Sequence, residues 1–254
     1  GNYTDPMLIV NNMGADAIRL YLVSSPLVRA EPLKFMDDGV WQTVREIFLP
    51  WYNAYRFFIQ NASRYEAKSS QKYVYDEQSI HNATNFMDIW IVAACQNLIK
   101  YVRNEMEHYR LYTVVPALLK FLNNLTNWYV RLNRKRIKGE TPLEDTKIAL
   151  DTLMHTLLNV TVLMSPFTPF ITENIYQNLR LGLPEESEDR QESIHFVMIP
   201  QFKAELINEG IEKSVSRMQV IIDLARKVRD KKKIVLKTPV SRIKVIHRDE
   251  EYLE

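Results

Sequence analysis

The residues best suited to chemistry in this sequence are cations and amides that repeat along one predicted helix. The stretch from Thr113 to Lys138 predicts a single long helix, with Thr113 as its N-cap and Pro116 in its first turn. At 100° per residue its polar positions fall within about 60° of one line, which runs for roughly 27 Å. These positions are Lys120, Asn124, Asn127, Arg131, Arg134, Lys135 and Lys138.

This polar face carries one sign of charge. No acidic residue lies between Thr113 and Lys138, whereas a solvated helix face gains stability by mixing signs at i,i+4 spacing. A rigid row of cations with interleaved amides is typical of a surface that binds a polyanion, and the amides favour RNA over a membrane. Two alternatives stay open: the face is only solvated, and Trp128 lies at the edge of the core instead of stacking on a base.

The opposite side of the same helix is predicted to be buried, because apolar residues recur there at three- and four-residue steps. We therefore expect the rest of the chain to be organised around this helix. Arg136 falls on the apolar side, so either its side chain reaches back to water or the helix is frayed there. The apolar positions are Val115, Leu118, Leu122, Leu125, Tyr129 and Leu132.

A second cluster of cations follows a later helix. Residues 210–230 predict a helix, and Asp230 is the only acidic residue in the basic run at its end. If both clusters contact RNA, they bind different parts of it. The alternative is a solvated terminus whose cations complement the helix dipole. The candidate RNA contacts in this cluster are Arg226, Arg229, Lys231, Lys232 and Lys233.

The composition argues against several other kinds of site. The chain has 254 residues, of which 46% are hydrophobic and 25% charged, and its net charge of +2 means that RNA binding must depend on local patches. One cysteine, Cys95, permits no internal disulfide and indicates a reducing compartment. The five histidines are scattered, so no zinc site is expected. No phosphate-binding glycine loop, hydrolase motif, membrane-length apolar run or signal peptide is visible.

Helices must position these cations, because glycine is scarce, at 6 residues, and helix formers dominate. The helix at 88–109 should lie antiparallel to the central helix, which Gly139 should end. Residues 68–82 predict a polar loop. Further helices are predicted at 16–24, 37–65, 143–164 and 168–179. Extended segments are predicted at 28–35 and 194–199, and short β-strands at 234–236 and 243–246.

The stretch NWYVRLNRKRIKGE at 127–140 is one of seven segments that, in order, resemble a single family. It resembles the end of the anticodon-domain helix of class I isoleucyl-tRNA synthetases of the eukaryotic cytosolic type. One departure is Asp88-Ile89-Trp90, where that family often has Asp-Arg-Trp, so no arginine role carries over there. The other segments are NYTDP at 2–6, GADA at 14–17 followed by Arg19, LPWYNAYRFFIQN at 49–61, YRLYTVVPALLKF at 109–121, SPFTPFITENIYQNL at 165–179 and KTPVSRIKVIH at 237–247.

The resemblance implies a mainly α protein, the anticodon-binding helical bundle of a class I synthetase. Residues 1–38 would end the catalytic and stem-contact region, 39–184 would form the bundle, and 185–254 would be a linker and the start of a small C-terminal α/β unit. The HIGH and KMSKS motifs are absent, so the chain alone should be inactive and need no cofactor.

The resemblance also implies what the parent enzyme does. It would be a cytoplasmic ligase that attaches isoleucine to tRNA(Ile) with ATP and magnesium, and its partners would be tRNA(Ile) and the upstream catalytic and editing domains of the same chain, with no membrane. The alternatives are the same bundle from a valyl-, leucyl- or methionyl-tRNA synthetase, and a helical scaffold that binds protein without RNA. Oligomeric state cannot be inferred from these features.

Overall fold

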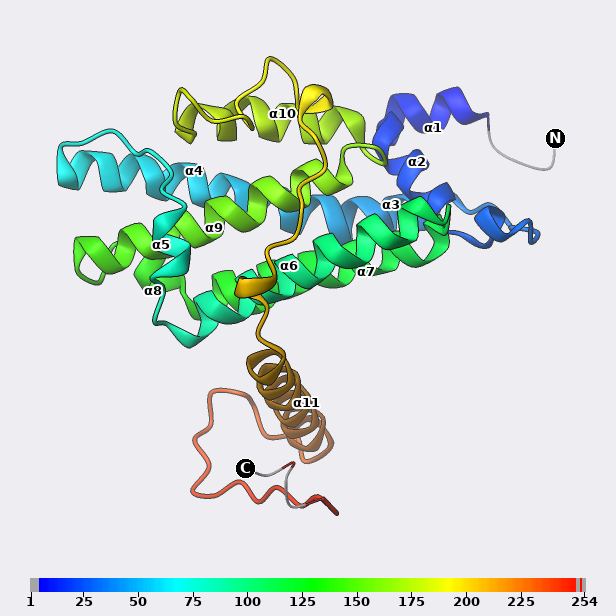
Figure 1. The fold of residues 1–254 in the computed structure, drawn as a ribbon. Helices are drawn as coiled ribbons and strands as arrows, with labels where there is room; N and C mark the ends of the chain where they lie inside the picture. The colour runs from blue at the N-terminus through cyan, green and yellow to red at the C-terminus, as the bar shows by residue number, and fades with distance from the viewer. Residues whose placement is uncertain (1–4, 250–251, 253–254) are drawn as a thin grey trace. The chain divides into compact units, whose positions relative to one another are not determined.

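The computed structural model describes residues 5–249 and 252, and in this part of the chain all regular structure is helical (Figure 1). Contacts divide the chain into two compact units, Gly1–Ile207 and Asn208–Glu254. The prediction of a mainly α bundle is confirmed.

The first unit is a bundle in which two π-helical segments continue α-helices without a break. These are η2 (Val44–Phe48) after α3 and η3 (Asn124–Val130) after α7. The α-helices of this unit are α1 (Pro6–Met13), α2 (Ala15–Val23), α3 (Asp37–Thr43), α4 (Leu49–Ser69), α5 (Gln78–His81), α6 (Phe86–Glu107), α7 (Leu111–Asn123), α8 (Arg134–Ile137), α9 (Leu143–Met164) and α10 (Pro169–Leu179). Short 3-10 turns are η1 (Pro26–Arg29), η4 (Arg180–Gly182), η5 (Ile194–Phe196) and η6 (Ala204–Leu206). The second unit contains α11 (Glu209–Lys231).

The centre of the bundle is α9, with α4, α6, α8 and α10 packed against it (Figure 1). Of its 22 residues, 16 are buried, so the helix has no solvated face. Its buried threonines satisfy their hydroxyls within the helix, as where Thr152 donates to the Ile148 carbonyl at 2.9 Å and Thr161 to the Leu157 carbonyl at 2.6 Å. The expectation that the 113–138 helix forms the centre is therefore wrong.

The predicted antiparallel pairing of the helix at 88–109 with the helix that begins the 113–138 stretch is correct. α6 and α7 lie next to each other in opposite directions, joined by a turn of three residues. However, α7 begins at Leu111, so Thr113 is not its N-cap and Pro116 lies inside the helix. The Thr113 hydroxyl instead donates to Glu105 of α6 at 2.7 Å, which ties the two helices together at the turn.

The predicted extended segments do not form β-strands within the described residues. Residues 26–29 and 194–196 form 3-10 turns, and residues 234–236 and 243–246 are turns and loops. A β-strand requires a neighbouring strand that takes up its backbone hydrogen bonds, and these segments do not pair with one another. As far as it is described, the second unit therefore holds a helix and an irregular segment without β-strands.

One further prediction needs correction. The segment 68–82 is only partly a loop, because α4 extends to Ser69 and α5 forms a short turn of helix. Of the NYTDP segment at 2–6, residues 2–4 lie outside the described residues. Asp5 is the N-cap of α1 and accepts from the Met7 amide at 2.9 Å, while Pro6 occupies the first helical position.

The start of α10 is held by α2, far away in the sequence. Asp16 accepts from the Ile171 amide at 2.7 Å, and Arg19 donates to the Phe167 carbonyl at 3.2 Å. Asp16 thus caps α10, although Thr168 occupies the N-cap position and makes no side-chain cap bond. The GADA segment with Arg19 therefore fixes the corner between α9 and α10.

The segment between α10 and α11 follows the first unit closely. Arg180 donates to the Gln191 carbonyl at 2.8 Å, and Glu173 accepts from the Ile194 amide at 2.9 Å. Ile194 is fully buried. The domain boundaries expected at 38/39 and 184/185 remain predictions.

Candidate nucleic-acid interface

The π-helical segment η3 changes which residues of the predicted basic helix face the core. A π turn takes one more residue than an α turn, so every residue after it is rotated by about 100°. Leu132, predicted to be buried, is 54% exposed, and Asn133 is buried at 3%. Ile137 then continues the buried side. The predicted straight line of polar residues is therefore broken at η3.

The polar residues of this helix nevertheless reach the surface. Lys120 is exposed before η3, Asn127 is exposed within it, and Arg131, Arg134 and Lys135 are exposed after it. Asn124 and Lys138 are partly exposed, and Lys138 lies 4.0 Å from Glu140. Trp128 is partly buried, as expected for a residue at the edge of the core. The exposed cations therefore do not form one line, because Lys120 stands before η3 and the other three follow it.

Arg136 anchors the end of this helix to the core. Its guanidinium donates to Asp88 of α6 at 2.8 Å and to Asp145 of α9 at 2.7 Å. Asp88 is fully buried and also accepts from the Tyr129 hydroxyl at 2.8 Å. Neither snorkelling nor fraying describes Arg136, because its charge is paired inside the bundle. Gly139, with φ +71°, ends the helix as predicted.

Hydrogen bonding keeps this ionic cluster charged. The Arg136 hydrogen bond lowers the pKa of the Asp145 carboxyl, an effect that burial only partly opposes. Burial acts to lower the pKa of Arg136, but hydrogen bonds to Asp88 and Asp145 outweigh it and raise that pKa. Burial and the adjacent Asp88 carboxylate raise the pKa of Tyr129. The cluster thus fixes α8 while its neighbours Arg134 and Lys135 face solvent.

A groove of about 460 Å³ separates this helix from α4. Phe57 of α4 lies beneath Arg134, with 5.0 Å from the guanidinium carbon to the ring centroid, which is cation–π distance. Further along, the Lys68 ammonium donates to the Gly139 carbonyl at 2.7 Å. The polar side chains that line the groove are Asn53, Arg56, Gln60, Thr126, Asn127 and Arg134.

Sequence reasoning missed the contribution of α4. Asn53, Arg56, Phe57 and Gln60 follow each other at i, i+3, i+4 and i+7, which places them on one helix face. That spacing is the signal by which the sequence could have revealed this face of α4. Of the predicted contacts, Asn127 and Arg134 line this groove, whereas Lys120, Arg131 and Lys135 do not.

In the second unit the predicted cations have different surroundings. Arg226 pairs with Asp223 at 3.1 Å. Arg229 donates to the carbonyls of Val235 and Thr238, at 3.1 and 3.0 Å, and so holds the irregular segment against the end of α11. Arg229 therefore has a structural partner in the chain. Exposed lysines follow at the end of the helix, namely Lys231, Lys232 and Lys233.

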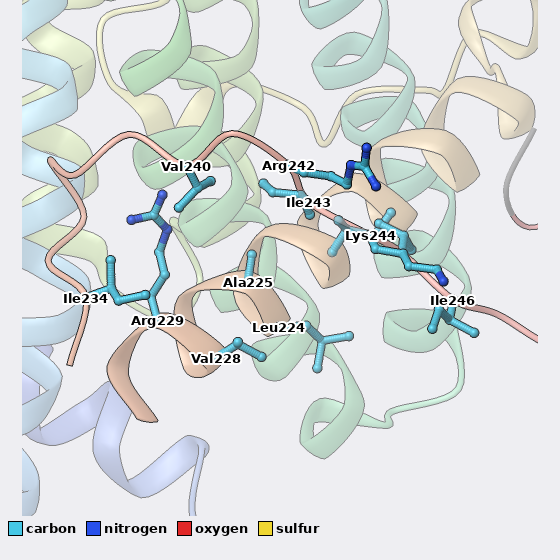
Figure 2. A pocket seen from close by; sticks show the side chains of 12 residues that line it. Leu224, Ala225, Val228, Arg229, Ile234, Val240, Arg242, Ile243, Lys244 and Ile246 are labelled. Atoms are coloured by element: carbon cyan, nitrogen blue, oxygen red, sulfur yellow. The ribbon is translucent and has the colours of Figure 1, made fainter. Parts of the chain in front are cut away.

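The same unit contains an apolar groove of about 340 Å³ between α11 and the residues that follow it. Figure 2 shows Leu224 and Ala225 on α11, and Val240 and Ile243 on the irregular segment. Arg242 and Lys244 are interleaved with these apolar residues (Figure 2). Nine of its twelve lining residues are apolar and the other three are cations, so it lacks the side-chain amides of the groove beside α4.

No group of three or more histidine, cysteine or acidic residues in the described part of the chain could hold a metal ion. Across the same residues, every helix is too short or too polar to cross a bilayer. Burial raises the pKa of the Cys95 thiol to about 12, which makes it unreactive as a nucleophile.

Comparison with known protein families assigns this chain to one of them. The family model described as the anticodon-binding domain of tRNA ligase matches residues 88–246. The chain belongs to this family. The matched region includes α6, η3, α8 and the central helix α9, so the ionic cluster around Arg136 and the exposed cations beside it lie within the anticodon-binding domain.

Curated relatives carry more detailed names. "Isoleucine--tRNA ligase" of Tetrahymena thermophila is 51% identical over 254 residues, which is 99% of this chain and 24% of the relative. "Isoleucine--tRNA ligase, cytoplasmic" of Mus musculus is 49% identical over 255 residues, covering all of this chain and 20% of the relative. The chain thus spans about a fifth to a quarter of these relatives.

One solved structure shares the fold. A ternary complex of Agrobacterium radiobacter K84 LeuRS, tRNA and LeuAMS contains a chain that matches with a TM-score of 0.53 and 20% identity. The match covers 81% of this chain and 22% of that one. At this identity the likeness describes the fold of the anticodon-binding domain and leaves the amino acid and the RNA contacts unassigned.

Proposed function

We propose that this chain is the tRNA-binding part of an isoleucine–tRNA ligase and that it binds the anticodon arm of tRNA(Ile). Membership of the anticodon-binding family and relatives named isoleucine–tRNA ligase, about half identical over the whole chain, support this assignment. The observation that carries the RNA contact is the exposed group Arg131, Arg134 and Lys135, which the buried Arg136 cluster holds rigidly at the surface.

The parent enzyme, in this proposal, attaches isoleucine to tRNA(Ile) in the cytoplasm, using ATP and magnesium at a catalytic site outside this chain. The described residues offer no cluster of metal ligands, so no step of that reaction is assigned to them. The contribution of this chain is to bind and orient the RNA. Its partners are tRNA(Ile) and the catalytic and editing domains of the same enzyme.

We propose two groups of RNA contacts. The first basic group is Arg131, Arg134 and Lys135, and it acts together with Lys120, Asn124, Asn127 and Lys138. The second basic group, at the end of α11, is Arg226, Arg229, Lys231, Lys232 and Lys233. Cations bind phosphates and amides bind bases or sugars. Arg229 contributes least in this scheme, because its guanidinium already bonds two carbonyls of its own chain.

The test is the salt dependence of tRNA binding. Each phosphate contact to a single strand contributes a slope of about −0.7 in log K against log salt. Four such contacts, made by Arg131, Arg134, Lys135 and Lys138, give roughly −3. Replacing Arg131 and Lys135 together by alanine should flatten the slope by about 1.4. Titration of tRNA(Ile) and a non-cognate tRNA with the chain at several salt concentrations measures both values.

Two comparisons make the result specific. Replacing Lys72 and Lys100, exposed cations elsewhere in the bundle, removes the same charge and should change the slope by less than one contact. A slope unaffected by the Arg131 and Lys135 change would remove this helix from the interface. Equal affinity for non-cognate tRNA would favour a different synthetase bundle, and no binding to any tRNA would favour the protein-binding scaffold.

A further inference from the structure

The helix α2 connects α1 to the bundle. It packs against α1 and also against three helices of the bundle, which are α3, α7 and α10. Ala17 and Leu20 of α2 are fully buried. The side chains of α2 therefore influence the angle at which the N-terminal helices meet the bundle.

Two charged side chains of α2 bind the corner where the chain turns from α9 into α10. The Asp16 carboxylate accepts from the Ile171 amide at 2.7 Å through Oδ2. Arg19 lies three residues later, on the same helix face. Its guanidinium donates to the carbonyls of Phe167 and Pro166, at 3.2 and 3.1 Å. An anion thus lies at the N-terminus of α10 and a cation just past the C-terminus of α9, which is the arrangement that favours both helix dipoles.

Stability alone does not require this arrangement. Thr168 occupies the N-cap position of α10, where a local hydroxyl can satisfy a free amide, but it makes no side-chain cap bond. Asp16 is buried instead, and within the described residues its Oδ1 has no hydrogen-bond partner, which costs stability. Burial raises the pKa of this carboxyl, and the Ile171 amide and Arg19 only partly oppose that effect. A cap from a distant helix differs from a local one in a single respect, which is that it fixes α2 on α10.

We propose that Asp16 and Arg19 are positioning residues for the attachment of isoleucine to tRNA. The inference rests on the proposed function, in which the bundle binds the anticodon arm and the catalytic domain lies upstream. With the corner fixed, the angle between the N-terminal helices and the bundle is set before tRNA arrives. A tRNA held by the bundle then presents its 3′ end at the catalytic site. The two side chains act through α9 and α10 and contact neither the RNA nor the reacting atoms.

The experiment introduces Asp16→Ala into the full-length parent enzyme and measures two reactions. Charging of tRNA(Ile) should lose kcat by about 10- to 100-fold, because a small misplacement of the reacting groups has an effect of that size. The KM for tRNA should stay the same, because the RNA contacts are intact. Isoleucine-dependent pyrophosphate exchange, which is measured without tRNA, should also be unchanged. Asp16→Asn keeps an acceptor for the Ile171 amide and should restore most of the lost kcat.

Two further variants separate positioning from stability. Asn85 caps α6 by accepting from the Met87 amide at 2.9 Å, so its cap bond stays within one helix end. Asn85→Ala should therefore lower the melting temperature about as much as Asp16→Ala and leave the charging kcat unchanged. Arg19 is exposed, so Arg19→Ala should not prevent folding. It should lower the charging kcat and spare pyrophosphate exchange, as Asp16→Ala does.

The positioning role is overturned if Asp16→Ala and Arg19→Ala leave the charging kcat unchanged, reduce pyrophosphate exchange as much as charging, or only raise the KM for tRNA. An equal loss of charging kcat in Asn85→Ala would also overturn it, because the effect would then follow from lost stability. The unaltered 254-residue chain tests the proposed function separately. Its failure to bind tRNA would overturn that function, whereas tRNA affinity that is the same with and without Asp16→Ala supports both.

Discussion

Arg136 is the cation of the basic helix that anchors its end to the core of the bundle. It connects α8 to α6 through Asp88 and to α9 through Asp145. Asp88 is fully buried, and its carboxylate accepts from this guanidinium and from the Tyr129 hydroxyl. The neighbouring cations keep their positions at the surface because this one residue faces inward.

Replacing Arg136 with methionine should lower the free energy of unfolding by about 3–5 kcal/mol, because it leaves a buried carboxylate without its counter-charge. Urea unfolding measures the change. Arg131→Met removes the same charge from the exposed side of the helix and should cost at most about 0.5 kcal/mol. Equal losses for the two variants would contradict the role of the buried cluster.

His155 of α9 is the residue through which pH should act on stability. Burial lowers the pKa of its imidazole to about 4. Gln96 accepts from the Lys203 amide at 2.8 Å through its carbonyl oxygen, so its NH₂ group faces His155 Nε2 at 3.3 Å. Nε2 is then the acceptor, and Nδ1 carries the proton toward the Tyr75 hydroxyl at 2.9 Å. The folded state therefore holds neutral imidazole.

As pH falls from about 6.5 to about 4, the unfolded chain binds a proton at His155 before the folded chain does. The free energy of unfolding should therefore decrease over this window, by roughly 3 kcal/mol in total. His155→Gln removes the titration, so the difference between the two proteins should change with pH only in that window. Urea unfolding at several pH values measures it, and a constant difference would contradict the buried neutral state.

At the scale of elements, the two π-helical segments set the phase of the helices that carry the interface. η2 precedes Pro50, whose missing N–H interrupts an α-helical ladder, and η3 precedes the exposed cations. Both segments lie beside the seam between α4 and α7, where the groove begins.

The phase of the α7–η3–α8 helix can be tested with two leucines. Leu122→Ala should cost about 2–5 kcal/mol, because Leu122 is buried before the π turn. Leu132→Ala should cost at most about 0.5 kcal/mol, because the π turn has rotated that position into solvent. Thermal or urea unfolding decides between this pattern and an uninterrupted α-helix, for which both leucines would cost several kcal/mol.

The sequence allowed some elements to be placed closely and others not at all. α9 occupies the predicted residues Leu143–Met164, because its apolar pattern is long and Pro166 follows it. The π turns could not be predicted, because a π turn adds only one residue. The repeat of apolar residues fits the helix equally well with or without that extra residue. The predicted β-strands do not form in the described residues. Alternating apolar residues indicate only that one face of a segment is buried, whereas a β-strand also needs a neighbouring strand to pair with.

The candidate interface was predicted only where it lies on one helix. Arg131, Arg134 and Lys135 could be identified because their spacing on a single segment predicts a shared surface. The groove beside α4 could not be predicted, because Phe57 and Arg134 come from different helices and their contact depends on how α4 packs beside η3. Arg136 was placed on the correct side, but its partners lie on two other helices.

At the scale of the whole molecule, the two basic groups belong to separate compact units. We expect them to contact different parts of one tRNA. Replacing Lys231, Lys232 and Lys233 together by alanine should expose a set of nucleotides to hydroxyl-radical cleavage that differs from the set exposed by the Arg131 and Lys135 change. Footprints unaltered by the triple substitution would identify the second group as a solvated helix end that complements the dipole.

The bond between Asp16 and the Ile171 amide joins residues 155 positions apart. A ribosome that adds about 5–20 residues per second makes Asp16 roughly 8–30 seconds before its partner exists. During that time α2 can pack against α1, α3 and α7 but not against α10, which has not been synthesised. The corner between α9 and α10 therefore closes late in translation.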